Sequence, residues 1–221
     1  MIRNKSKSIK NEIVKYAKIL DSKGLVNSVE GNLSIIDRET GELYITPSGT
    51  RKLFLNEDSI AVLHGDKQIG GNLKRSSEYL LHVAALNARP DCNAAAHIHA
   101  PYLTAFAYCA KDIEIKCSTT FALLFGNKIQ CLPYGEPGTV HIADGIDEVL
   151  KNNDLVLLAN HGVIAVGKTL EDAVKIIEAA EEVLKIYMIA NGIGTLSNIT
   201  SRQYESLNNN HLASIKNRFK T

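Results

Sequence analysis

Apolar residues recur at helical spacing between Ile9 and Leu20, and Gly24 supplies a stop after them. This spacing predicts a first helix, because residues three or four positions apart share one helix face. Two apolar runs, over residues 33–36 and 43–45, then flank a polar segment that ends in glycine. Such a pattern is typical of two antiparallel strands joined by a turn, and we expect a β-hairpin here.

The middle of the chain alternates short strands with helices. A strand is expected over residues 59–64, and a helix from Ser76, whose hydroxyl can cap it, to about residue 87. The pair Arg89-Pro90 ends this helix, because the residue before a proline disfavours helical geometry. The next strand ends at His97-Ile98-His99, and Pro101 opens another helix that runs to about residue 110.

The second half contains two apolar strands, over residues 155–159 and 163–166, separated by a tight connection that holds His161. A long helix is expected from about residue 170 to 191, with Thr169 as its cap and a glycine as its stop. The chain becomes polar after residue 196. We expect a mobile tail from about residue 197, which only a neighbour or a ligand would order.

Helices and short strands in this mixed order favour an α/β fold, namely a three-layer α/β/α sandwich with a central, largely antiparallel sheet. A Rossmann fold is disfavoured, because no Gly-rich dinucleotide fingerprint follows a first strand. The chain has 221 residues, enough to bury a substantial core without disulfides. We therefore expect a single domain over residues 1–221.

Composition narrows the possible partners and location. The chain carries 25 basic and 24 acidic residues, so its net charge of +1 suggests neither a nucleic acid nor an anionic membrane surface as partner. No stretch approaches the ~20 apolar residues of a membrane span, and no apolar signal core follows the N-terminus. The four cysteines form no CxxC pair, as is usual in a reducing compartment. We expect a soluble, cytoplasmic protein.

Three histidines are candidate metal ligands. Side chains two apart in a strand point the same way, so His97 and His99 can bind one ion while Ile98 packs into the core. His161, at a distant strand end, can supply a third imidazole and leave a position open for substrate, as in catalytic zinc sites. Buried histidines that bond to a carbonyl give the same spacing, so this structural alternative stays open.

Three polar segments could hold an anion: Gly31-Asn32-Leu33-Ser34, Thr46-Pro47-Ser48-Gly49 and Ser76-Ser77. Glycine beside hydroxyls lets backbone N–H groups approach a phosphate, and a helix start adds unpaired amides. Glu78 follows in the first turn of the expected helix. It could complement the helix dipole, as many first-turn glutamates do, or act as acid and base beside a bound phosphate and metal.

Taken together and in this order, these segments, the His97-x-His99 pair and His161-Gly162 resemble the class II aldolase/adducin family. The resemblance extends from about residue 5 to 190. It implies an α/β/α fold, a homotetramer, and a zinc enzyme that cleaves a sugar phosphate by a retro-aldol reaction. One Zn²⁺ per subunit is implied, although other divalent metals could replace it.

The resemblance makes His97, His99 and His161 the zinc ligands and Glu78 the catalytic acid and base. It assigns the substrate phosphate to five residues, which are Asn32, Ser48, Gly49, Ser76 and Ser77. The implied substrate is a ketose 1-phosphate, cleaved to dihydroxyacetone phosphate and a short aldehyde. Aldolases of the family carry a tyrosine near position 118, but residues 116–120 contain none here, so the aldehyde end of the site departs from the pattern.

Alternatives remain open. A sugar-phosphate 4-epimerase shares the fold, metal and phosphate site but typically has aspartate where this chain has Glu78. A methylthioribulose-1-phosphate dehydratase keeps both the metal and the glutamate. An adducin-like binding module would have no need of three histidines and a glutamate. An unrelated barrel hydrolase with a His-x-His pair is disfavoured, because such a barrel typically needs about 250 residues and places the pair near its N-terminus.

Overall fold

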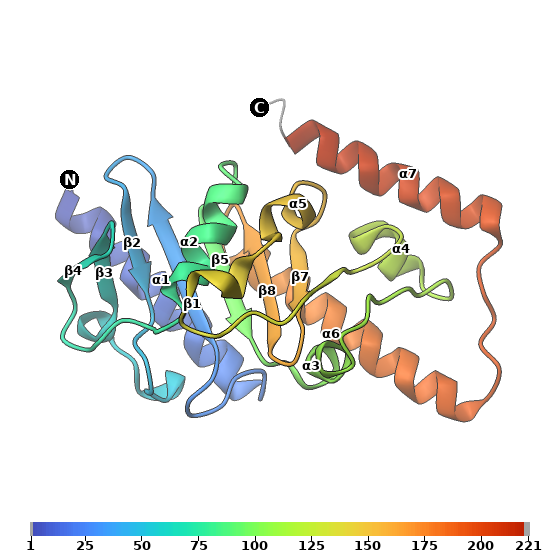
Figure 1. Cartoon of the computed structure of the whole chain (residues 1–221), viewed down its shortest axis with the longest axis horizontal. Helices are drawn as coiled ribbons and strands as arrows, with labels where there is room; N and C mark the ends of the chain where they lie inside the picture. The colour runs from blue at the N-terminus through green and yellow to red at the C-terminus, as the bar shows by residue number, and fades with distance from the viewer. Residues whose placement is uncertain (1, 219–221) are drawn as a thin grey trace.

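The computed structural model describes residues 2–218 and folds them around one eight-stranded sheet (Figure 1). The strand order is β4-β3-β2-β1-β5-β8-β7-β6, and every neighbouring pair is antiparallel except β6 and β7. The strands are β1 (Asn32–Asp37), β2 (Glu42–Ile45), β3 (Ala61–His64), β4 (Lys67–Gly70), β5 (Ala94–Ile98), β6 (Cys131–Leu132), β7 (Leu155–Leu158) and β8 (Gly162–Gly167).

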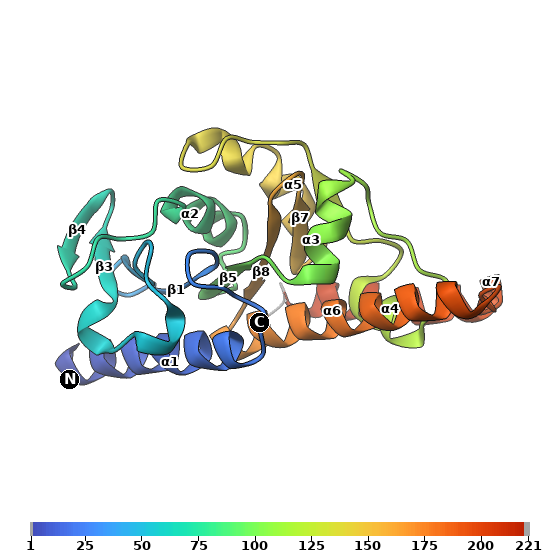
Figure 2. The same cartoon turned by 90° about the horizontal axis from the view of Figure 1, so that it is seen from below.

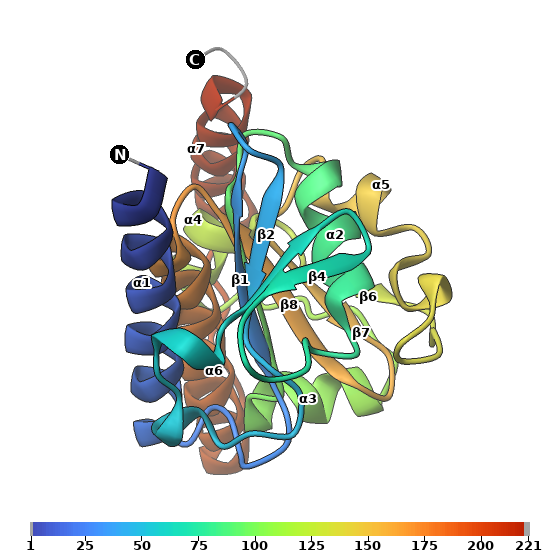
Figure 3. The ribbon, with the colours of Figure 1, turned by 90° about the vertical axis from the view of Figure 1, so that its left-hand side faces the viewer.

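Helices cover both faces of the sheet, so the molecule has three layers, as Figure 2 and Figure 3 show. Helices α1 and α6 lie on one face, and α2 and α5 lie on the other. The predicted sandwich with a largely antiparallel sheet is confirmed.

None of the helices within residues 2–218 is long and apolar enough to cross a bilayer. The α-helices are α1 (Ile2–Ser22), α2 (Tyr79–Ala88), α3 (Pro101–Tyr108), α4 (Thr119–Phe125), α5 (Ile146–Leu150), α6 (Leu170–Ile193) and α7 (Ser201–Arg218), and the short 3₁₀ helices are η1 (Lys52–Phe54), η2 (Glu57–Ser59) and η3 (Val140–Ala143).

Alternation of side chains along the central strands gives each face of the sheet its own core. In β5, Ala94, Ala96 and Ile98 pack among the residues of α1 and α6. The residue between the first two, Ala95, instead belongs to the core under α2 and α5. His97 has the same parity as Ala95, and this places its ring on the α2 face of the sheet.

Two local predictions are confirmed by hydrogen bonds. Strands β1 and β2 form the expected hairpin, paired from Ser34↔Ile45 to Asp37↔Glu42. Thr169 caps α6, because its hydroxyl accepts from the backbone N–H of Asp172 at 3.2 Å while the Asp172 carboxylate accepts from the Thr169 N–H at 3.1 Å. Helix α6 continues to Ile193, just past the glycine that was expected to end it.

The start of α2 differs from the prediction. Ser76 does not begin the helix, which starts at Tyr79 and leaves Glu78 as the residue before its first turn. The reason is that the Ser76 N–H donates to the Thr46 carbonyl at 3.3 Å, so this segment stays extended beside the end of β2. The Ser76 hydroxyl instead accepts from the Glu78 N–H at 3.2 Å. The Gly65-Asp66 pair after the strand expected over residues 59–64 is a hairpin signal, and the edge strand β4 does follow it, although no strand was predicted over its own residues.

The polar tail, for which a mobile segment was expected from about residue 197, contains helix α7 packed against α4 of the same chain. Tyr204, His211 and Ile215 are buried, and their spacing of seven and four residues puts them on one face of α7. The Tyr204 hydroxyl lies 2.8 Å from the Gly126 carbonyl, to which it donates. A narrow buried stripe within a polar sequence therefore holds this helix in place.

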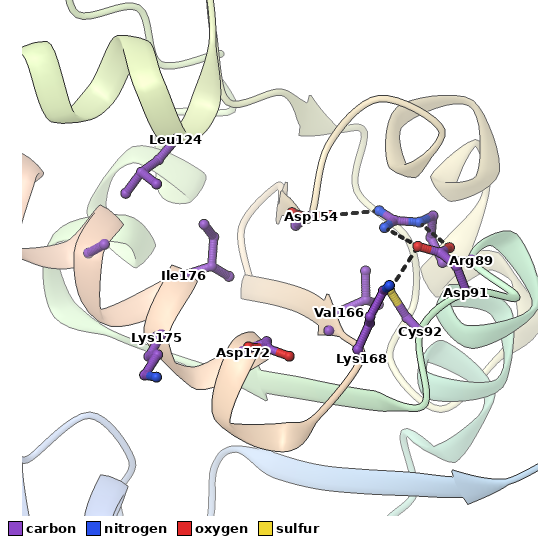
Figure 4. A pocket seen from close by; sticks show the side chains of 12 residues that line it. Arg89, Asp91, Cys92, Leu124, Asp154, Val166, Lys168, Asp172, Lys175 and Ile176 are labelled. Carbon is purple, nitrogen blue, oxygen red and sulfur yellow. Dashed lines mark hydrogen bonds and ion pairs between the residues drawn. The ribbon is translucent and has the colours of Figure 1, made fainter. Parts of the chain in front are cut away.

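A second feature of the fold is a buried arginine beside a surface pocket lined by residues of α4, α6 and β8 (Figure 4). Arg89 is 3% exposed and donates to the Asp91 carboxylate through two bonds of 2.8 Å. It also donates to Asp154 at 2.7 Å and to the carbonyls of Asn153 and Leu150 at 3.0 and 3.3 Å. These contacts fasten the end of α2 to the loop before β7.

Replacing Arg89 with methionine should destabilise the protein by about 3–5 kcal/mol, because it leaves two carboxylates without their buried cation. Urea unfolding followed by circular dichroism measures this loss. The matched control is Lys151→Met, because Lys151 and Glu148 are both exposed and form an ion pair at 2.6 Å. Such exposed pairs contribute about 0–1 kcal/mol. Equal losses in the two variants would contradict the structural role assigned to Arg89.

Candidate active site

Three elements bring the predicted metal ligands together at one end of the sheet. His97 is on β5, where it pairs with Asn32 of β1 on one side and Ile164 of β8 on the other. His99 follows directly after β5. His161 lies in the turn between β7 and β8, next to Asn160, whose φ of 58° is left-handed and reverses the chain there. Strand pairing therefore closes the large gap in sequence between His161 and the His97-x-His99 pair.

The three imidazoles form a group that could hold one metal ion. One nitrogen from each ring lies within 4.8 Å of the others, and the Nε2 atoms of His97 and His99 are 3.2 Å apart. The ring centroids are separated by 4.8–5.0 Å, and each pair of rings meets edge to face. His97 is fully buried, while His99 and His161 are partly exposed. Such a set of three imidazoles fits zinc and related divalent ions.

Hydrogen bonds on the far side of two rings aim their Nε2 atoms at the common centre. His97 Nδ1 donates to the Val163 carbonyl at 2.9 Å, and His99 Nδ1 lies 3.3 Å from the Glu30 carboxylate. Burial lowers the pKa of His97 to about 3, so the ring is neutral and its Nε2 keeps a lone pair for a metal. His161 Nδ1 is buried without a hydrogen-bond partner among residues 2–218.

Glu78 places its carboxylate against the histidines. Oε1 lies 3.0 Å from His161 Nε2, and Oε2 lies 3.5 Å from His97 Nε2. The Asn32 amide also donates to Oε2 at 2.7 Å. Burial alone would raise the pKa of the Glu78 carboxyl, but the bond from His161, the positive charge that His97 carries in the acidic range where this carboxyl titrates, and the bond from Asn32 together hold it well below its usual range. The group is therefore an ionised carboxylate, able to accept a proton.

The segments predicted to hold an anion lie side by side. The Ser48 N–H donates to the Lys74 carbonyl at 3.0 Å, so the turn with Ser48 and Gly49 runs alongside the approach to Ser76. Both turn residues are exposed, as is Ser77, whereas Ser76 and Asn32 are buried. Ser77 and Glu78 share a pocket of about 380 Å³ with His99 and His161. The structure thus brings these candidates to one end of the sheet.

Three residues of this region were missed by the sequence analysis. Glu30 and Tyr108 line the pocket, and Tyr108 is 61% exposed. Lys52 is 2% exposed; its burial lowers the pKa of the ammonium group, while the charges of Asp21, Glu78 and Glu30 raise it. None of the three lies in a recognisable motif. Only the positions of Glu30 just before the Gly31-Asn32 segment, and of Lys52 just after Ser48-Gly49, could have drawn attention to them.

Gly162 lets the third ligand approach the other two. A Cβ atom at this position would lie 2.7 Å from the Ile98 carbonyl and 2.8 Å from the His99 ring. We expect Gly162→Ala to displace His99 and weaken metal binding by about 10–100-fold, as does loss of a residue that orients a ligand. Competition with a chromophoric chelator measures the affinity. In the control Gly192→Ala a new Cβ meets nothing within 4 Å, and an equal affinity in both variants would refute the steric argument.

Comparisons with known proteins agree with this geometry. The model of the family described as Class II Aldolase and Adducin N-terminal domain matches residues 11–188. The chain is 32% identical over 200 residues to 5-deoxy-D-ribulose 1-phosphate aldolase of Bacillus thuringiensis serovar kurstaki, covering 90% of this chain and 92% of that protein. It is 29% identical over 187 residues to 3-oxo-tetronate 4-phosphate decarboxylase of Haemophilus influenzae, with coverages of 83% and 88%. A solved structure named L-fuculose 1-phosphate aldolase superposes with a TM-score of 0.82 and 30% identity, covering 91% of this chain and 95% of that one.

Aldolases and decarboxylases both break carbon–carbon bonds and are lyases. The prediction of a lyase of the class II aldolase type is therefore confirmed, as is the predicted fold. The decarboxylase is a relative that the sequence analysis did not consider. Over most of its length, the chain belongs to the class II aldolase and adducin N-terminal domain family.

Proposed function

We propose that this chain cleaves a ketose 1-phosphate, similar to L-fuculose 1-phosphate, by a zinc-dependent retro-aldol reaction. The products would be dihydroxyacetone phosphate and a short aldehyde. The observation that carries the proposal is the ionised Glu78 carboxylate, which lies 3.0 and 3.5 Å from ring nitrogens of a histidine trio. Relatives named as aldolases of 5-deoxyribulose and fuculose phosphates support this choice of substrate.

His97, His99 and His161 would hold the metal, with zinc as the first candidate and one ion per chain. Their Nε2 atoms converge, and the partners of Nδ1 in His97 and His99 fix the direction of those rings. A divalent ion at this point would act as a Lewis acid toward the ketone oxygen of the substrate. The rings would also orient the sugar, because they occupy one side of the site and leave the side toward the pocket open.

Glu78 would act as the acid and base. In the cleavage direction its carboxylate would accept the proton of the C4 hydroxyl as the C3–C4 bond breaks and the aldehyde forms, and would then give this proton to C3 of the three-carbon fragment. In the synthetic direction the same two transfers would run in reverse. Its position before α2 matters, because the residue faces the pocket instead of lying along the helix. The hydrogen bond from Asn32 keeps one carboxylate oxygen fixed while the other remains next to His161.

Asn32, Ser48, Gly49, Ser76 and Ser77 would bind the phosphate. Support comes from their common location where β1 begins and β2 ends, and from the open space beside Gly49, where a Cβ would meet nothing within 4 Å. Gly49 has a φ of 64°, which favours glycine and exposes the backbone of the turn. The second N–H of the Asn32 side-chain amide would donate to the anion while the first stays on Glu78.

Assembly and location complete the proposal. We expect a homotetramer, and the exposed apolar side chains near the end of α6, Ile186, Met188, Ile189 and Ile193, support a contact with another copy. Light scattering should give a mass four times that of one chain. The four cysteines, which all lie in the described part of the chain, are free thiols, and this supports a reducing, cytoplasmic location.

A substrate panel tests the reaction. The zinc-loaded protein is given the 1-phosphates of fuculose, rhamnulose, 5-deoxyribulose and methylthioribulose, together with ribulose 5-phosphate and 3-oxo-tetronate 4-phosphate. Release of dihydroxyacetone phosphate, followed through a coupled loss of NADH, should occur with a ketose 1-phosphate and vanish after chelation. Absence of triose phosphate from every substrate, with one metal bound per chain, would refute the aldolase. An epimer, a dehydrated product or carbon dioxide would then identify the epimerase, dehydratase or decarboxylase.

A further inference from the structure

We propose that His82 is a positioning residue, which holds the Asn32 amide in the orientation that presents a donor to Glu78. The chain of contacts runs from Ser34 through His82 and Asn32 to the Glu78 carboxylate, and we call these four residues the Ser34–Glu78 relay. The relay itself is a feature of the fold, whereas its effect on catalysis rests on the proposed function, because it acts through Glu78.

Hydrogen bonds join all four members of the relay. His82 is fully buried on α2, and its Nδ1 lies 2.7 Å from the Ser34 hydroxyl. Its Nε2 is hydrogen-bonded to the Asn32 side-chain oxygen. The Asn32 amide nitrogen lies 2.7 Å from Glu78 Oε2. Ser34 is fully buried and Asn32 is 5% exposed, so water does not compete for these bonds.

The direction of each bond follows from the chemistry at the two ends. A carboxylate can only accept, so the Asn32 NH₂ group must face Glu78 and its oxygen must face His82. That oxygen can only accept, so His82 Nε2 carries a proton. In a neutral ring Nδ1 is then an acceptor, and the Ser34 hydroxyl donates to it. Burial lowers the pKa of His82 to about 4, in agreement with a neutral ring.

Regular geometry places the four side chains in contact. Asn32 and Ser34 are two residues apart on β1, so both point to the α2 face of the sheet. His82 lies on the first turns of α2, four residues after Glu78, which caps that helix. Strand β1 therefore supplies two members, and α2 with its capping residue supplies the other two. This role accounts for the presence of a polar, fully buried histidine between β1 and α2.

Loss of the relay would free the Asn32 amide to rotate and turn its oxygen toward the Glu78 carboxylate. The carboxylate would lose a donor and face a negative dipole, which disturbs proton transfer more than it disturbs substrate binding. We therefore expect kcat to fall while KM changes little. A purely structural role for His82 would predict reduced stability without this split.

Two substitutions separate the nitrogens of His82. Glutamine can place an amide N–H near the position of Nε2, whereas asparagine reaches only the position of Nδ1. We expect His82→Asn to lower kcat by about 10–100-fold and His82→Gln by less than about 5-fold, by analogy with residues that orient a catalytic group. His64→Asn is the matched control, because His64 is exposed at the end of β3. It should match the unsubstituted protein.

The direct measurement is exchange of the C3 proton of dihydroxyacetone phosphate with D₂O, followed by proton NMR on the zinc-loaded protein. This exchange needs no aldehyde and reports the proton transfer assigned to Glu78. Exchange lowered equally in the asparagine and glutamine variants, with both folded, would overturn the relay. If the unsubstituted protein exchanges no proton, the proposed function fails instead, and the next measurement still decides the relay.

Nitrogen-15 NMR of the unsubstituted protein tests the proton position without any variant and covers the case in which His82 variants do not fold. The relay predicts that His82 is neutral with its proton on Nε2. Asn32→Ala should populate the other tautomer, because it removes the oxygen that accepts from Nε2 and leaves the Ser34 hydroxyl to accept from Nδ1. A proton on Nδ1 in the unsubstituted protein, or a tautomer that does not respond to Asn32→Ala, would overturn the proposal.

Discussion

Replacing Glu78 with glutamine should lower the rate of triose phosphate release by about 10²–10⁴-fold, which is the usual contribution of a positioned acid or base. Glutamine keeps the shape of the side chain and a hydrogen bond to the site but cannot accept a proton. The ionised state of Glu78 follows from its bonds with His161 and Asn32 and from the nearby His97. The loss should appear in kcat, since the three histidines and the phosphate segments are untouched.

The measurement is the coupled assay with the best substrate of the panel, accompanied by the metal content of the same sample. Glu205→Gln is the matched control, because Glu205 is exposed on α7 and remote in sequence from every site residue. It should retain full activity. A Glu78→Gln protein that keeps one metal per chain and more than about a tenth of the activity would contradict the acid and base role, since such a role contributes at least about 100-fold.

Replacing His161 with alanine should abolish stoichiometric metal binding. Two ligands from β5 would remain, but the set would lose the imidazole that closes it from the β7–β8 turn. Loss of a residue that only orients a metal ligand lowers the metal affinity by about 10–100-fold. We expect loss of the ligand itself to lower the affinity further. Because His161 is in a turn and partly exposed, the sheet should tolerate the substitution.

Metal analysis after equilibrium dialysis measures the loss, and far-ultraviolet circular dichroism checks the fold. His141→Ala serves as the control, because His141 is exposed in η3. Among the ion pairs of residues 2–218 it takes part in one, with the Asp144 carboxylate at 3.0 Å. That variant should bind one ion per chain. Full binding by the His161 variant would show that the histidine trio is not the metal site.

The sequence was most informative where chemistry depends on spacing. The alternation of side chains in a strand was enough to pair His97 with His99, and the order of motifs was enough to select Glu78. Contacts that depend on strand pairing could not be read in this way. Asn32 reaches Glu78 because Thr46 binds the Leu33 N–H through its hydroxyl and the Ser76 N–H through its carbonyl. Glu30 reaches His99 because the loop before β1 passes the end of β5.

Other misses have a physical cause in the surroundings of the residues. Serine is a residue type that often caps helices, but the Ser76 N–H is bonded to the Thr46 carbonyl. Because of this tertiary bond, α2 begins only at Tyr79. Helix α7 was missed because its buried stripe of Tyr204, His211 and Ile215 is too sparse to raise the average hydrophobicity of the tail. Propensity and composition describe single residues, whereas these outcomes depend on neighbours from elsewhere in the chain.

The candidate site is built from two kinds of segment with different freedom to change. His97, buried beneath the pocket, sits on a central strand, where a substitution disturbs the pairing of both neighbours. Val29, Tyr108 and Asn160 line the pocket itself from bends, turns or the last residue of a helix. Residues at the rim of the pocket can therefore be substituted during evolution while those on the central strand stay the same. A single scaffold of this design can acquire new sugar phosphates, or a different bond to break, through substitutions at its loop ends alone.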